Sequence, residues 1–150
     1  GDAPLEQELA YIKNLKKCFL AVAGATVQTL TTQLEQEQEI LMNLSDIMAE
    51  IYLCESTVLR TLKRIQYLSV KDCEISILMS QVYVNDAIER VAQHARAAVA
   101  AWAEGDMKRT LLLAIKRFTK FEPINTKELR RRIAQHIIAA GEYTHRNGNQ

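Results

Sequence analysis

Apolar residues recur at steps of three and four along most of the chain, and this spacing limits the possible folds most strongly. In residues 5–34 the repeating positions include Ile12, Leu15, Phe19 and Val22. Such spacing places the apolar side chains on one face of an α-helix, which has 3.6 residues per turn. Only two prolines and five glycines punctuate the 150 residues, so the tight turns of hairpins are scarce and helix is favoured throughout.

Five helices are expected from this periodicity. The second carries a stripe through Leu41, Leu44, Met48 and Ile51, and Glu55 interrupts this stripe one turn later. We expect each apolar stripe to face the core of the protein. The expected helices cover residues 5–34, residues 36–68, a segment from residue 69 to 103, residues 107–120 and a segment from residue 125 to about 141.

Residues with short polar side chains mark where the later helices begin. Ser69 is a predicted N-cap for the third helix, because its hydroxyl can accept a hydrogen bond from a free backbone N–H group. Gly105 and Asp106 break the third helix, and Asp106 can cap the fourth. Asn125, with Glu128 three residues later, resembles a capping box at the start of the fifth.

The predicted fold class is an all-α, up-down antiparallel helical bundle of three long helices plus two shorter C-terminal helices. No alternating strand pattern competes with the helical stripes, and the expected connections are short. A chain of 150 residues is long enough to bury a core of its own. We therefore expect one domain over residues 1–142, followed by a disordered tail at 143–150.

The formal net charge of +1 is unevenly distributed along the chain. Residues 1–59 contain nine acidic and three basic residues, whereas basic residues are concentrated between Lys108 and Arg132. This cluster could attract an acidic surface, membrane phosphates or nucleic acid, although Lys and Arg are also normal residues of solvated helix surfaces. No nucleic-acid partner is expected. The candidate interaction face consists of Lys116, Arg117, Lys120, Lys127, Arg130 and Arg131.

The three cysteines Cys18, Cys54 and Cys73 are widely spaced and odd in number, which argues against a disulfide framework and indicates a reducing compartment. Each lies among apolar helical residues, where a thiol is expected to be buried and unreactive. The first residues lack the pattern of a secretion signal, and every stretch long enough to span a membrane contains charges. A cytoplasmic location is expected.

Catalytic and metal-binding motifs are missing from the sequence. It contains no glycine-rich phosphate loop, nucleophile elbow or His-Glu-x-x-His motif. A di-iron bundle needs two Glu-x-x-His pairs on different helices, and only Glu142 and His145 match this spacing. His94 and His136 are isolated on different predicted helices. We expect no catalytic, cofactor-binding or metal-binding residue in this chain.

Glu55 is a charged residue on an otherwise apolar helix face. Burying its carboxylate costs free energy unless a cation pairs with it. One interpretation is a buried ion pair with a cationic residue of another helix, such as an arginine of residues 130–132. The other is a side chain turned outward at the edge of the apolar stripe.

Several segments resemble acyl-CoA dehydrogenases. The sequence AVAGATV at residues 21–27 is similar to the Ala/Gly-rich first helix of their C-terminal bundle, and DIMAEIYLCESTVLR at residues 46–60 is similar to the second. Residues 6–30, 36–60 and 105–134 resemble still more closely the extra C-terminal domain of bacterial and very-long-chain-type members. This resemblance covers nearly the whole chain.

Two departures from the family pattern concern the catalytic residues. Where the catalytic bundle has an Arg-Lys-x-Phe-Gly loop that contacts flavin, this chain reads TQLEQEQEI at residues 32–40. The nearest counterpart of the segment that carries the catalytic base is AEGD at residues 103–106, which lacks the Tyr and Thr of the family motif. The resemblance therefore gives Glu104 no catalytic role.

The resemblance implies a non-catalytic C-terminal domain of an FAD-dependent enzyme that oxidises fatty acyl-CoA to trans-2-enoyl-CoA in β-oxidation. FAD would belong to the parent enzyme, and the partners would be the upstream catalytic domains of the same polypeptide. The implied roles are packing on the catalytic body, dimer arrangement and membrane-surface attachment. An isolated domain can also pair with itself through exposed apolar surface. The alternative is a free-standing helical adaptor that binds an anionic partner or membrane through its basic face.

Overall fold

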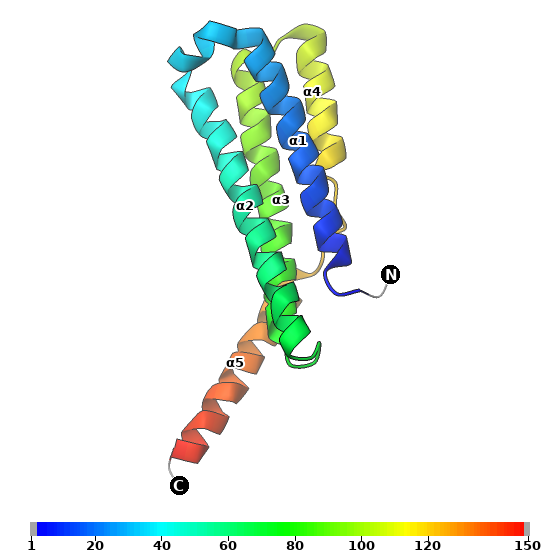
Figure 1. Cartoon of the computed structure of the whole chain (residues 1–150), viewed down its shortest axis with the longest axis vertical. Helices are drawn as coiled ribbons and strands as arrows, with labels where there is room; N and C mark the ends of the chain where they lie inside the picture. Colours follow the sequence, from blue (N-terminus) through cyan, green and yellow to red (C-terminus); the bar gives the residue numbers. More distant parts are fainter. Residues whose placement is uncertain (1–2, 149–150) are drawn as a thin grey trace.

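The computed structural model describes residues 3–148, and all of its regular elements are helices. Four α-helices form an antiparallel bundle, and a fifth α-helix points away from it (Figure 1). This arrangement confirms the predicted all-α, up-down fold. The elements are α1 (Glu6–Leu30), the 3-10 helix η1 (Thr31–Gln36), α2 (Gln38–Tyr67), α3 (Glu74–Trp102), α4 (Gly105–Phe118) and α5 (Thr126–Gly148).

The core lies where α1, α2 and α3 meet. Ile12, Leu15, Ile47, Ile88 and Val91 are at most 1% exposed. Around the bundle the helices follow the order α2, α1, α4, α3, because α2 contacts α1 and α3, whereas α4 contacts the same two helices from the other side. The pair α1–α2 and the pair α3–α4 therefore form opposite faces of the bundle.

The first helix ends earlier than the sequence predicts. Thr31 adopts a positive φ of 42°, which a β-branched residue rarely tolerates, and its N–H group donates to the carbonyl of Val27 as the helix stops. The chain then continues as η1, which keeps Leu34 packed against the core. The predicted continuous helix over residues 5–34 was therefore wrong at its C-terminal end.

Two predicted caps were also wrong. Ser69 accepts a hydrogen bond from the Asp72 N–H at 3.1 Å, but this bond stabilises a turn that precedes α3, which begins at Glu74. Asp106 lies inside the first turn of α4, where it forms an ion pair with Arg109 at 2.9 Å. The N-cap of α4 is Glu104 instead, because the chain turns into the helix at Gly105 with a φ of 58°.

Helix α5 begins as expected and ends later than expected. The Asn125 side chain accepts a hydrogen bond from the Glu128 N–H at 3.1 Å, which confirms the predicted cap. The helix does not end near Gly141, because Gly141 lacks the positive φ that helix-ending glycines adopt. Helix α5 instead runs to Gly148, through most of the predicted tail, while residues 149 and 150 lie outside the described part.

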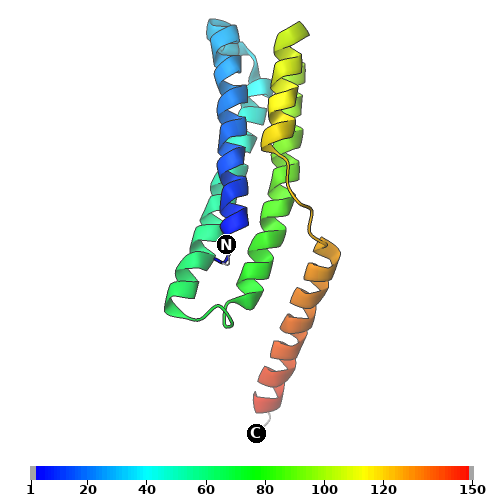
Figure 2. The same ribbon diagram turned by 90° about the vertical axis from the view of Figure 1, so that its right-hand side faces the viewer.

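Helix α5 leaves the bundle through the connection that follows α4. Among the described elements it contacts α3 alone, and it extends past the turn between α2 and α3 (Figures 1 and 2). Two ion pairs attach its first turns to α3, Arg130 with Asp86 at 2.6 Å and Arg132 with Glu74 at 3.2 Å. Most of its surface is therefore exposed.

Candidate functional site

The cysteine thiols lie in the core and are suited to packing. Cys18, Cys54 and Cys73 are all buried and free of disulfides. Burial raises the pKa of the Cys18 thiol to about 11. Burial, with a smaller effect of the Glu50 carboxylate, raises the pKa of Cys54 to about 12. A nucleophilic cysteine needs a lowered pKa, so these two thiols are unreactive near neutral pH.

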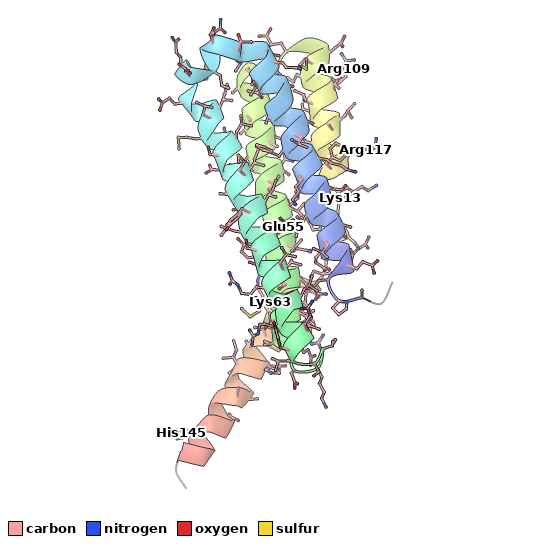
Figure 3. The ribbon with its side chains drawn as sticks, in the orientation of Figure 1. Lys13, Glu55, Lys63, Arg109, Arg117 and His145 are labelled. Carbon is pink, nitrogen blue, oxygen red and sulfur yellow. The ribbon has the colours of Figure 1, made fainter. Side chains whose placement is uncertain are left out.

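The histidines do not converge on a metal site. His94 Nδ1 lies 3.4 Å from the Asn43 side-chain oxygen and 3.8 Å from an Asp46 carboxylate oxygen, both on α2. His136 is exposed on α5, and His145 lies close to the free end of the same helix (Figure 3). Across residues 3–148, no group of three or more potential ligands is placed to hold a metal ion.

Glu55 pairs with a cation of another helix, as the first interpretation expected, but the cation is a lysine of α1 and the pair is not buried. Its carboxylate lies 2.5 Å from Lys16 Nζ of α1, and the Glu55 and Lys16 side chains are 36% and 49% exposed. Glu55 thus lies midway along α2 (Figure 3), at the edge of the α1–α2 contact. The arginines of residues 130–132 pair instead with Asp86, Glu128 and Glu74.

A better-formed ionic contact, which was not predicted from the sequence, joins α2 to α3. Glu50 accepts two hydrogen bonds from Arg90, at 2.7 Å from Nε and 3.1 Å from a terminal nitrogen. The Glu50 side chain is only 19% exposed. The Arg90 guanidinium also lies 5.6 Å from the centre of the Tyr83 ring. Hydrogen bonding to Glu50 raises the pKa of Arg90, so the guanidinium stays protonated in this contact.

The six basic residues predicted to form one face are divided among α4, the connection that follows it and α5. Arg130 and Arg131 are neutralised by Asp86 and Glu128, at 2.6 and 3.7 Å. Lys127 is exposed on α5. The other three, Lys116, Arg117 and Lys120, line a groove of about 800 Å³ between α3 and α4. We call this hollow the α3–α4 groove.

The opposite side of the bundle has an exposed apolar surface. On α2, Leu41, Met48, Tyr52 and Leu59 follow one another at steps of seven and four, and their side chains are 36% to 72% exposed. This spacing places them on one line along the helix. The line runs beside Glu55 and hence along the contact with α1.

Helix α1 continues this surface with Leu20 and Val27, which are 68% and 51% exposed. Leu20 lies one turn beyond Lys16, the residue that pairs with Glu55. The six residues on the two helices are named here the α1–α2 apolar face. The sequence predicted Leu41 and Met48 as core residues, but their neighbours Ile40 and Ile47 occupy the core instead.

Comparisons with known proteins point to one family. Residues 14–117 match the family model described as acyl-CoA dehydrogenase, C-terminal domain. A probable acyl-CoA dehydrogenase of Bacillus subtilis is 35% identical over 144 residues, which are 96% of this chain and 24% of that protein.

A solved structure agrees with this match. The crystal structure of an acyl-CoA dehydrogenase complexed with FAD from Bacillus anthracis superposes with a TM-score of 0.88 at 34% identity. It covers 93% of this chain, whereas the chain spans 24% of its length. The residues that match the family model include all of α2 and α3 and most of α1 and α4. The chain therefore belongs to the acyl-CoA dehydrogenase family, in which it corresponds to a C-terminal helical domain.

Proposed function

We propose that this chain is the non-catalytic C-terminal domain of an FAD-dependent acyl-CoA dehydrogenase and that its α1–α2 apolar face packs on the catalytic body. The parent enzyme would oxidise fatty acyl-CoA to trans-2-enoyl-CoA. The observation that carries the proposal is the α1–α2 apolar face, because six large apolar side chains are exposed on two adjacent helices. Contiguous exposed apolar surface of this kind marks an interaction site.

The connection between α1 and α2 does not fit a flavin cofactor. The η1 connection and the first turn of α2 carry Glu35, Glu37 and Glu39, and these carboxylates would repel the pyrophosphate of FAD. The flavin would therefore be held by the other domains of the parent enzyme. The contribution of this chain would be structural, because its bundle would pack in a fixed position on the catalytic body.

The free-standing adaptor has less support. Two of its six basic residues, Arg130 and Arg131, are paired within the chain, and the others are divided among α4, the connection after it and α5. None of the described helices has the length and apolar character needed to cross a bilayer.

A chimera tests the packing role. In the Bacillus subtilis relative, this chain would replace the segment of 144 residues that it matches, and calorimetry would follow unfolding. If the domain packs on the body, the two unfold together. Met48→Lys with Tyr52→Lys is expected to separate the transitions, because two charges would enter an apolar interface.

A matched control is Ile137→Lys with Ile138→Lys, which changes two apolar residues on α5 that are both 60% exposed. These changes are expected to leave the joint transition intact. Separate unfolding of the unaltered chimera would contradict the packing role. Equal effects of the two double variants would mean that the α1–α2 apolar face is not the contact.

A further inference from the structure

The α3–α4 groove has an apolar floor. Ile88, Ala92 and Ile115 lie at its base and are almost fully buried, while Leu112 and Leu113 form part of the wall on α4. Leu113 is 61% exposed. The volume of about 800 Å³ lies within the range that holds small-molecule ligands. The floor is suited to an alkyl chain, which makes no polar contacts.

The rim of the groove is cationic. Arg96 of α3, Lys116 and Arg117 of α4, and Lys120 just after α4 line it, and Glu89 is the one acidic residue among its lining residues. Among the described side chains, none of these four cations has a carboxylate partner within ion-pair distance. The groove therefore has an excess of three positive charges, in contrast to the paired arginines of α5.

We propose that the α3–α4 groove binds a long-chain acyl-CoA, with the acyl chain on the apolar floor and the phosphate groups against the cationic rim. An alkyl chain alone would leave the cations unused, and a simple carboxylate would neutralise about one of them. A head group with several phosphates matches four cations from α3, α4 and the connection after α4, because Arg and Lys are the usual phosphate-binding side chains. The choice of acyl-CoA rests on the function proposed above.

The proposed site and the proposed packing surface are on opposite sides of the bundle, so one does not block the other. The α1–α2 apolar face belongs to α1 and α2, and α2 has no contact with α4. Acyl-CoA binding can therefore be measured on the isolated chain, without a catalytic body. A negative result in this binding measurement would count against the groove alone, whereas the chimera tests the packing role.

Isothermal titration of the purified chain with palmitoyl-CoA tests the site, with CoA and palmitate as partial ligands. Saturable binding is expected, weakened by at least about tenfold when either the acyl chain or the phosphates are missing. Lys116→Glu with Lys120→Glu is expected to weaken palmitoyl-CoA binding by at least about tenfold. Leu113→Gln, an exposed change on the apolar wall, should weaken palmitoyl-CoA without affecting CoA. Circular dichroism checks that each variant is folded.

The matched control is Arg60→Glu with Lys63→Glu. These residues are exposed on α2, carry no ion pair among the described side chains and change the net charge by the same amount. Figure 3 shows Lys63 on α2 and Arg117 on α4, well separated along the bundle. The control should bind within about twofold of the unaltered chain.

Three results would overturn the proposal. The first is absence of palmitoyl-CoA binding to the folded chain. The second is an equal loss in the groove variant and the control, which would indicate unspecific attraction by net charge. The third is binding to anionic vesicles, lost in the groove variant, without binding of monomeric palmitoyl-CoA, which would assign the groove to a membrane surface.

Discussion

Trp102, the last residue of α3, donates a hydrogen bond from its indole Nε1 to the hydroxyl oxygen of Thr26 on α1, at 3.0 Å. Thr26 is fully buried, and its hydroxyl donates in turn to the carbonyl of Val22 at 2.6 Å. One buried hydroxyl thus joins two helices that lie far apart in the sequence. The bond also satisfies the indole N–H at the point where α3 ends.

Thr26→Val keeps the shape of the side chain but removes the acceptor for Trp102. The free energy of unfolding is expected to fall by about 1–3 kcal/mol, because the indole N–H would lose its partner in a largely buried place. Urea unfolding followed by the fluorescence of the single tryptophan measures this. Thr57→Val is the control, since Thr57 also donates to a carbonyl four residues back but joins no second helix. Equal losses in the two variants would contradict the role of the Thr26–Trp102 bond.

The two ion pairs of α2 should differ in their contribution to stability. Glu50→Gln is expected to lower the free energy of unfolding by about 1–2 kcal/mol, because Glu50 is largely buried and holds Arg90 through two charge-assisted bonds. Glu55→Gln should cost only about 0–1 kcal/mol, since water screens its contact with Lys16. Urea unfolding of both variants in the same buffer gives the comparison. A larger loss for Glu55→Gln would reverse this order.

The number and approximate positions of the helices could be predicted because their apolar residues repeat every three or four positions. The exposed side of α2 could not be predicted in the same way. Ile40 and Ile47 precede Leu41 and Met48, and both pairs have helical spacing. The first pair is buried and the second exposed. The difference depends on where α1 and α3 lie around α2. The spacing of apolar residues within one helix carries no information on these positions.

The absence of catalytic motifs was visible in the sequence, whereas the arrangement of charges was not. Glu55 was expected to find a cation on another helix, and the partner is Lys16 rather than an arginine of residues 130–132. Those arginines contact α3 and their own helix, since α5 leaves the bundle. Arg96 joins Lys116 and Lys120 only because α3 and α4 are antiparallel neighbours. Partners of this kind are set by tertiary structure.

The buried thiols should make the protein less stable in alkaline solution. The folded-state pKa values of Cys18 and Cys54, about 11 and about 12, lie above the ordinary value of 9.0. The folded state therefore holds the thiol protons more tightly than the unfolded state does. The stability that the two thiols contribute is fully present below pH 9 and is lost as the pH rises through the folded-state pKa values. The loss is at most about 1.4 kcal/mol per pH unit for each thiol.

Urea midpoints between pH 8 and the alkaline limit test this effect. Cys18→Ala with Cys54→Ala should flatten the decline, because alanine does not ionise. The double variant would start from a lower stability, since it leaves small cavities, so the slope with pH is the quantity to compare. An unchanged slope would assign the alkaline loss to other groups.

Glu8 is a buried carboxylate in the first turn of α1, and it should destabilise the fold at neutral pH. Burial raises its pKa above the ordinary value of 4.5, an effect larger than the opposing one of a backbone hydrogen bond. The folded state therefore favours the protonated form, and the stability that this gives is present below pH 4.5 and lost as the pH rises. Glu8→Gln should raise the free energy of unfolding at pH 7 and have little effect at pH 4.

Glu6→Gln provides the control, because Glu6 lies in the same first turn but is exposed. Both changes remove a negative charge from the positive end of the helix dipole, which costs about 0.3–1 kcal/mol. Only Glu8→Gln also removes the cost of burying that charge, so the two variants should shift urea midpoints in opposite directions at pH 7. A destabilised Glu8→Gln variant at pH 7 would show that the helix dipole outweighs burial at this position.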